Sequence, residues 1–151
     1  MVFKGSISDI VPHDPPMVLL DRFVAATESA LEAEVHITEG SPFYCPEKGV
    51  PAYVGIEYIA QAISAYNGLL SYQNNEKIEL GFLLGSRRVD LKCAYFPVGS
   101  ILSILVNVSF NDGEMAVFDG TIILDGQAVV TGRINAYQPK NPRQLIKLTQ
   151  E

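Results

Sequence analysis

Residues 52–72 read AYVGIEYIAQAISAYNGLLSY and contain no proline. Apolar side chains occupy nearly every angular position around a helix with this sequence. A helix that is apolar all round is buried, either in a protein core or in a membrane. About 20 residues that each rise roughly 1.5 Å could span a bilayer, so length alone does not decide between the two.

Polar side chains inside this stretch argue against lipid. They are Glu57, Gln61, Ser64 and Asn67. An internal carboxylate in a segment that also holds Gln and Asn makes a membrane-spanning helix costly. Glu57, Gln61 and Ser64 lie at i, i+4 and i+7, so they form one narrow polar seam. We therefore expect a central helix wrapped by a sheet, and no membrane span.

The rest of the chain predicts strands. Before the helix they are expected over 17–25 and 31–37, and after it from about residue 78 to residue 93. Three more are expected over 101–110, 115–124 and 128–137. Asn111-Asp112-Gly113 and Asp125-Gly126 separate these three and are typical of hairpin turns, because Gly accepts a positive φ. The pattern predicts an α+β fold with an antiparallel sheet.

Size and composition fit one domain. The chain has 151 residues, 48% apolar and 19% charged, and we expect one domain over 1–138 with a polar tail over 139–151. A net charge of −6 argues against non-specific binding to nucleic acid. No signal peptide is visible, and Cys45 and Cys93 form neither a metal-type pair nor a disulfide framework. We expect a cytoplasmic protein with no metal and no cofactor.

Two stretches resemble the bacterial 3-hydroxyacyl-acyl-carrier-protein dehydratases. VPHDPPMVLLDRF, residues 11–23, resembles a segment in which Pro-His precedes a strand that ends in Asp-Arg. VPAYVGIEYIAQA, residues 50–62, resembles the family's central helix, with Pro51 six residues before Glu57 and Gln61 four after it. The chain looks most like the dehydratase-like subgroup associated with aryl polyene and related polyketide pathways. The resemblance covers residues 8–138 and implies a hot-dog fold, in which a sheet wraps one long helix.

One departure from the family pattern concerns the catalytic base. In the family, a Gly-His-Phe-Pro segment just before the helix supplies a catalytic His. The interval here, residues 41–51, reads SPFYCPEKGVP, which has no His and is about four residues shorter. Phe43 and Tyr44 resemble the aromatic pair that precedes the family's His loop. The base that removes the C2 proton is therefore missing from its usual place.

The resemblance implies chemistry on acyl thioesters. Dehydration of a 3-hydroxyacyl thioester needs a base at C2, an acid for the leaving hydroxyl and a donor to the thioester oxygen. Glu57 has the position of the acid in an apolar tunnel, where burial would favour its proton-donating form. Backbone N–H groups of Ala52, Tyr53 and Val54 would bind the substrate carbonyl, and Gln61 would orient the acid. The alternative is a buried carboxylate that this amide satisfies, with no chemistry.

Two His residues are candidates to replace the missing base. His13 resembles a family position that is usually structural. His36 lies in a strand pattern that turns it toward solvent. Asp21 and Arg22 resemble the family's Asp-Arg pair, which we expect to be a structural ion pair.

A basic group suggests where a partner docks. Arg87, Arg88 and Lys92 are the densest basic group in an acidic protein, and the last two would share one face of a strand. An acyl carrier protein is acidic, so this group would dock it; a solvated strand face is the alternative.

We expect the sheet to pair with that of a second subunit, because apolar edge strands such as 101–108 need cover. The resemblance implies a tunnel at the subunit interface, to which one subunit brings the acid and the other the base. The leading interpretation is a 3-hydroxyacyl-acyl-carrier-protein dehydratase, paired with itself or with another hot-dog protein. Alternatives are a base-deficient subunit of a heteromeric dehydratase, a hot-dog thioesterase and a thioester-binding module without turnover. The missing His favours the base-deficient subunit, whereas the retained Glu57 favours the complete enzyme.

Overall fold

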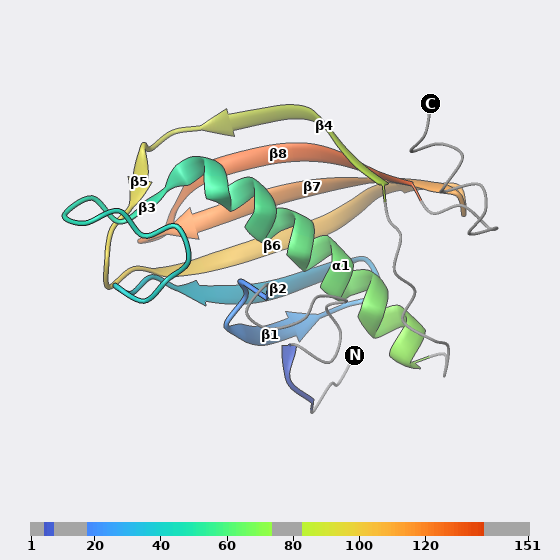
Figure 1. Ribbon diagram of the computed structural model, residues 1–151. Coiled ribbons are helices and arrows are strands. Elements are labelled where there is room, and N and C mark those ends of the chain that lie inside the picture. Colours follow the sequence, from blue (N-terminus) through green and yellow to red (C-terminus); the bar gives the residue numbers. More distant parts are fainter. Residues whose placement is uncertain (1–4, 8–17, 74–82, 138–151) are drawn as a thin grey trace.

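The computed structural model describes residues 5–7, 18–73 and 83–137. One long helix lies across a six-stranded antiparallel sheet (Figure 1). In spatial order the strands are β1 (Arg22–Ala26), β2 (Ala30–His36), β6 (Ile101–Asn111), β7 (Met115–Leu124), β8 (Gln127–Tyr137) and β4 (Leu83–Leu91). A small second sheet pairs β3 (Val50–Pro51) with β5 (Tyr95–Phe96). The 3₁₀ helix η2 (Ala52–Val54) leads into α1 (Gly55–Gln73), which confirms the predicted central helix.

Two glycines bring the helix into direct contact with β7. A Cβ atom on Gly55 would lie 2.7 Å from Cδ1 of Ile122, and one on Gly120 would lie 2.5 Å from Cγ2 of Ile59. Real Cβ atoms essentially never approach other atoms so closely, because van der Waals repulsion prevents it. A methyl group on Gly120 would meet Ile59 next to its own Cβ atom, whereas one on Gly55 would meet the end of the longer arm of the Ile122 side chain. The contact at Gly120 therefore has the least space for an added methyl group.

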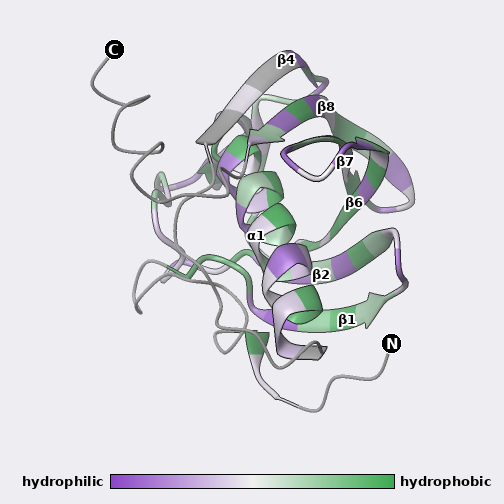
Figure 2. Ribbon diagram, turned by 90° about the vertical axis from the view of Figure 1, so that its right-hand side faces the viewer, coloured by the Kyte–Doolittle hydropathy of each residue, from purple (hydrophilic) through white to green (hydrophobic). Residues whose placement is uncertain are grey.

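The core fills the remaining space between helix and sheet. Along the strands, hydrophobic residues alternate with hydrophilic ones (Figure 2), as expected for a sheet with one buried face. The inner face of β2 and β6 buries Leu31, Ala33, Val35, Leu102, Ile104 and Val106. From α1, Tyr66 packs edge-on against Phe118 of β7, with ring centroids 5.6 Å apart.

Both predicted hairpin turns are confirmed. In the turn between β6 and β7, Gly113 has a φ of 95°, and the carboxylate of Asp112 accepts two backbone hydrogen bonds. Asp125 and Gly126 link β7 to β8 with φ values of 51° and 78°. The last strand ends at Tyr137, and the expected tail over 139–151 lies outside the described residues.

Three expectations about strands need correction. The first strand begins at Arg22, and the described residues before it, 18–21, are not part of a strand. The strand after the helix is described over Leu83–Leu91, so the predicted part before it lies outside the described residues. β6 was expected at the edge of the sheet, but it lies between β2 and β7. Its buried residues Leu102, Ile104 and Val106 belong to the core, whereas Ile101 and Phe110 are exposed.

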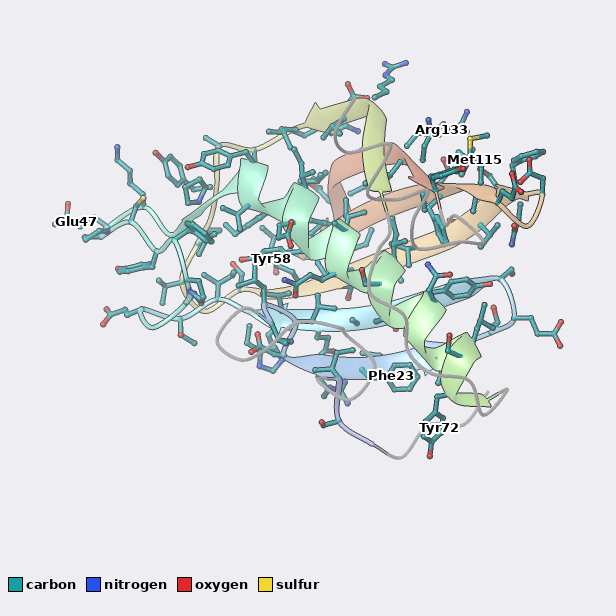
Figure 3. All side chains as sticks on the ribbon, turned by 45° about the vertical axis from the view of Figure 1, so that its right-hand side comes forward. Phe23, Glu47, Tyr58, Tyr72, Met115 and Arg133 are labelled. Carbon is teal, nitrogen blue, oxygen red and sulfur yellow. The ribbon has the colours of Figure 1, made fainter. Side chains whose placement is uncertain are left out.

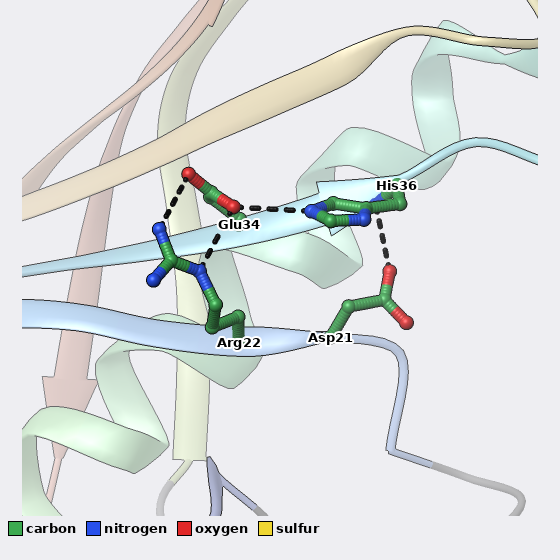
Figure 4. A network of polar contacts seen from close by, with 4 residues as sticks. All are labelled: Asp21, Arg22, Glu34 and His36. Atoms are coloured by element: carbon green, nitrogen blue, oxygen red, sulfur yellow. Dashed lines mark hydrogen bonds and ion pairs between the residues drawn. The ribbon is translucent and has the colours of Figure 1, made fainter.

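A polar network joins β1 to β2 on the outer face of the sheet (Figure 4). Nε and Nη2 of Arg22 each donate to the carboxylate of Glu34 at 3.1 Å, and Nε2 of His36 lies 3.0 Å from Oε1 of Glu34. The carboxylate of Asp21 accepts the backbone N–H of His36 at 2.7 Å. The expected pair between Asp21 and Arg22 was wrong, because the register of the two strands places Arg22 opposite Glu34.

We expect Glu34 to make the fold sensitive to acid. The hydrogen bonds from Arg22 and then from His36 lower the pKa of Glu34 from 4.5 to about 2. A depressed pKa stabilises the fold above about pH 4.5, and this stabilisation is lost as the pH falls toward 2. Glu34→Gln should therefore lower the stability by about 1 kcal/mol or less at pH 7, the range of exposed ion pairs, and should flatten its acid dependence. Urea denaturation at pH 7, 4 and 2.5 measures this, with Glu39→Gln, an exposed carboxylate outside the network, as the control. An unchanged acid dependence in Glu34→Gln would contradict the assignment.

Gly120 offers a test of the contact between α1 and β7. Gly120→Ala forces the added methyl group against Ile59, and such overpacking costs about 1–3 kcal/mol. Gly85→Ala is the matched control, because a Cβ atom there meets nothing within 4 Å. Thermal unfolding should show a lower Tm for Gly120→Ala alone. Equal Tm values for the two variants would show that the helix has freedom to move away from the sheet.

Candidate active site

Glu57 lies in the first turn of α1 on a face that turns away from the sheet. Its side chain is exposed, and so is that of Tyr53 one turn earlier, at 63%. Ala60 and Asn67 continue the same face and are half-buried. The expectation that the helix is buried all round was therefore wrong for a single chain. The expected tunnel at a subunit interface stays a prediction, and it needs a second wall beside this face of α1.

Gln61 holds the Glu57 side chain in place. It is 1% exposed, and its Oε1 accepts the backbone N–H of Leu19 at 2.7 Å. Its Nε2 donates to Oε1 of Glu57 at 3.3 Å. Because an amide has one oxygen and one nitrogen end, the bond from Leu19 directs the nitrogen of Gln61 toward the carboxylate. This geometry agrees with the orienting role expected for Gln61, while the catalytic role of Glu57 stays a prediction.

The segment expected to bind the substrate carbonyl is a 3₁₀ turn instead of the first turn of an α-helix. The N–H of Ala52 donates to the carbonyl of Ala94 at 2.9 Å, beside the short β3–β5 ladder. That N–H is therefore engaged and does not face a substrate, which corrects the expectation for Ala52. The N–H groups of Tyr53 and Val54 stay candidates.

The loop over residues 41–49 corresponds to the segment that carries the catalytic His in the dehydratase family that this chain resembles. Backbone hydrogen bonds close this short loop. Cys45 and Gly49 exchange two backbone hydrogen bonds, of 2.7 and 3.0 Å. Gly49 has a φ of 106°, and a Cβ atom there would lie 2.0 Å from the carbonyl oxygen of Phe96, so only glycine fits. Phe43 and Glu47 both have a φ of 68°, in the left-handed region. Glu47 lies at the outer tip of the loop in Figure 3.

The candidate replacement bases do not face Glu57 within the described residues. His13 lies outside those residues. His36 is exposed on the outer face of β2, where it contacts Glu34. Because Val35 beside it points into the core under α1, the sheet separates the His36 ring from the helix. Its predicted exposure is confirmed.

The basic group expected to dock a carrier protein lies at and just beyond one edge of the sheet. Nε of Arg88 pairs with Asp90 at 3.1 Å, and the Arg88 side chain is 80% exposed. Lys92 is exposed just after the end of β4. The side chain of Arg87 lies outside the described residues. Docking by this group stays a prediction.

A shallow hollow of about 570 Å³ lies beside Arg88 on the sheet. Arg133 of β8 stands opposite Arg88 in the register and pairs with Asp119 of β7 at 3.0 Å. Each arginine of the hollow thus has its own carboxylate. The hollow is remote from the loop tip marked by Glu47 (Figure 3) and holds none of the residues around Glu57.

Two features beside Glu57 were missed by sequence reasoning. The backbone N–H of Leu19, which fixes Gln61, has no side-chain signal. Tyr58 is 2% exposed, stacks on Phe96 with centroids 6.1 Å apart, and reads in the sequence as ordinary core. Burial raises the pKa of Tyr58 to about 12, so its phenol stays protonated beside the helix start.

None of the helices in the described ranges combines the length and the apolar character required to cross a bilayer.

Comparisons with known proteins place this site in context. A family model described as ApeP-like, ApeP dehydratase, matches residues 5–147. The chain is 28% identical over 138 residues to the 3-hydroxyacyl-acyl-carrier-protein dehydratase FabZ of Streptococcus sanguinis (strain SK36), covering 89% of this chain and 96% of that relative. It is 33% identical to a chain of the dehydratase heterocomplex ApeI:P from Xenorhabdus doucetiae, with a TM-score of 0.89, covering 99% of this chain and 100% of that one. The PaaI protein of E. coli, 12% identical with a TM-score of 0.59 and covering 77% of this chain and 81% of that chain, shares the fold. The expected hot-dog fold is confirmed.

We expect Gln61→Leu to destabilise the chain by about 1–3 kcal/mol, because it leaves the backbone N–H of Leu19 without its acceptor. Asn67→Leu is the matched control on the same helix. Asn67 donates to the carbonyl of Ile63, which keeps its helical partner when the amide is removed. Chemical denaturation should show a clearly larger loss for Gln61→Leu. Equal losses would mean that the bond to Leu19 contributes little.

Proposed function

We propose that this chain, which belongs to the ApeP-like dehydratase family, supplies the acid half of a composite site that dehydrates 3-hydroxyacyl thioesters. A second hot-dog subunit would bring the base. The observation that carries the proposal is an exposed Glu57, oriented by the buried Gln61, in a helix preceded by a loop without His.

The chemistry divides between the two subunits. The partner's base removes the C2 proton of the substrate, and the electron pair of that C–H bond moves onto the thioester. The pair then returns to form the C2=C3 double bond while the C3–O bond breaks, and the Glu57 carboxylic acid gives its proton to the departing hydroxyl. Water and a 2-enoyl thioester are the products. The N–H groups of Tyr53 and Val54 would stabilise negative charge on the thioester oxygen.

The packing of the helix supports a site that needs two chains. The contacts of Gly55 and Gly120 leave no room for an acyl chain between α1 and β7 at the level of the site. An extended acyl chain needs a concave, mostly apolar channel. The open face of α1 around Glu57 provides one wall of such a channel, and the partner would provide the other.

The sheet supplies an edge for pairing. β4 is nine residues long and has a neighbour on one side only, β8. A long open edge is normally covered in soluble proteins. The likeness to a chain of a dehydratase heterocomplex supports a partner that differs from this chain.

We further propose that an acyl carrier protein delivers the substrate. The exposed Arg88 and Lys92 would meet its acidic surface. Arg88 contacts Asp90 through Nε, so the guanidinium can still offer its two terminal nitrogens to a carboxylate or phosphate. Such contacts between exposed charges weaken as salt is added.

The test is a dehydration assay with a carrier-bound 3-hydroxyacyl chain. Alone, the chain should be a poor catalyst, because a positioned general base contributes about 10²–10⁴-fold in rate. Mixing with a hot-dog dehydratase whose loop carries the His should restore activity. Glu57→Gln should remove this gain and leave the complex intact by light scattering. Glu39→Gln, an exposed carboxylate outside the site, should behave as the wild type.

Two outcomes would contradict the proposal. Full activity of the chain alone would mean that it carries its own base, and variants of His13 and His36 would then identify it. Release of free acid from the thioester, with no dehydration in any mixture, would point to a thioesterase.

A further inference from the structure

We infer that Asp21 is a positioning residue for the acid Glu57, and that it acts through the backbone of residues 19–21. The inference rests on the proposed function and deepens it, since it names a residue outside the site on which the orientation of the acid depends.

Asp21 is fastened to β2 in two ways. It lies just before Arg22, the first residue of β1. Its backbone N–H donates to the carbonyl of Glu34 at 2.8 Å, and its Oδ2 accepts the backbone N–H of His36 at 2.7 Å (Figure 4). The side chain and the backbone of Asp21 therefore both fix this point of the chain to the sheet.

Two residues earlier, the same segment contacts the central helix. The N–H of Leu19 donates to Oε1 of Gln61 at 2.7 Å, and Nε2 of Gln61 donates to Oε1 of Glu57 at 3.3 Å. The side chain of Leu20, between the two contacts, is 3% exposed in the core. Because peptide units are planar and stiff, residues 19–21 form a short connection between β2 and the Gln61 amide.

A second observation also places Asp21 near the start of the helix. Burial, and then the negative charge of Asp21, raise the pKa of Tyr58 to about 12. Tyr58 directly follows Glu57 in α1. Electrostatic effects weaken with distance, so the carboxylate of Asp21 lies close to this part of α1. This agrees with a segment that passes from β2 to the helix within three residues.

The N–H of Leu19 selects which end of the Gln61 amide faces Glu57. The nitrogen end donates to the carboxylate, whereas the oxygen end would place two acceptors against each other. Loss of the bond from Asp21 to β2 would let residues 19–21 shift, and the N–H of Leu19 would then select the orientation less strictly. Asp21 contacts no substrate in the proposed site, so its effect is on the position of the acid and hence on kcat.

The first test uses this chain alone and needs no turnover. Hydrogen exchange of the Leu19 amide, followed by NMR, reports how firmly its bond to Gln61 is held. Asp21→Ala should accelerate this exchange about 3- to 10-fold, as expected for the loss of one ordinary hydrogen bond. The amide of Ile104, a buried residue of β6, reports global unfolding, so the ratio of the two rates isolates the local effect.

Two variants serve as controls for this exchange. Asp21→Asn keeps an oxygen that can accept the N–H of His36, so it should exchange as the wild type does. Arg22→Gln removes the guanidinium that binds Glu34 at the neighbouring position and keeps both bonds of Asp21, so it should do the same. Wild-type exchange in Asp21→Ala, or an equal acceleration in all three variants, would overturn the inference.

The second test measures kcat and KM in the heterodimer assay. Asp21→Ala should lower kcat by about 10- to 100-fold, the scale of a misplacement near 1 Å, with KM unchanged. Asp21→Asn and Arg22→Gln should keep the wild-type kcat. If Asp21→Ala fails to fold, Asp21→Leu replaces it, because that side chain is of similar size and has no acceptor.

The outcomes separate this inference from the proposed function. A wild-type kcat in Asp21→Ala, or an equal loss in Asp21→Asn, would overturn the inference and leave the proposed function standing. A wild-type rate in Glu57→Gln would instead refute the proposed function, and the exchange measurement is independent of that result.

Discussion

The close contact between α1 and β7 governs the rest of the molecule. At Gly55 and Gly120 the backbone of each element lies directly against an isoleucine side chain of the other, Ile122 and Ile59 respectively. Interiors at this density do not deform continuously, so the helix has one position on the sheet. That position decides which helix side chains face the core and which face outward. The position of the polar seam, Glu57, Gln61 and Ser64, relative to the strands is therefore set within the single chain.

The fixed helix gives Gln61 and Glu57 different environments although they lie one turn apart. Gln61 is buried and bonded to the backbone at Leu19, while Glu57 reaches the surface. The buried amide links the carboxylate to the rigid body of the protein. A carboxylate that is held through one oxygen by a buried amide, on an exposed side chain, is suited to meet a substrate supplied from outside. Preorganisation of this kind is what positions a proton donor for catalysis.

Local features of the fold could be predicted from the sequence, and long-range features could not. The central helix and the turns at Gly113 and Gly126 depend on residues that are adjacent in the chain. The place of β6 in the middle of the sheet and the pairing of Arg22 with Glu34 depend on register, which an apolar or charged run does not encode. The exposure of Glu57 was mispredicted for a related reason. A helix that is apolar all round indicates burial, but it does not tell whether the cover comes from the same chain or from another.

The conformation of the loop over residues 41–49 limits how this protein could evolve a catalytic base in that loop. Three separate features fix the conformation of this loop. They are its short length, the two backbone hydrogen bonds between Cys45 and Gly49, and the close approach of Gly49 to Phe96, which only glycine permits. A single substitution that introduces His into this loop would leave the ring on a short, closed turn, with the reach of the longer family loop still missing. We expect that regaining an independent base takes an insertion together with several replacements. The proposed division of labour between two subunits would therefore be easier to acquire by single substitutions than to reverse.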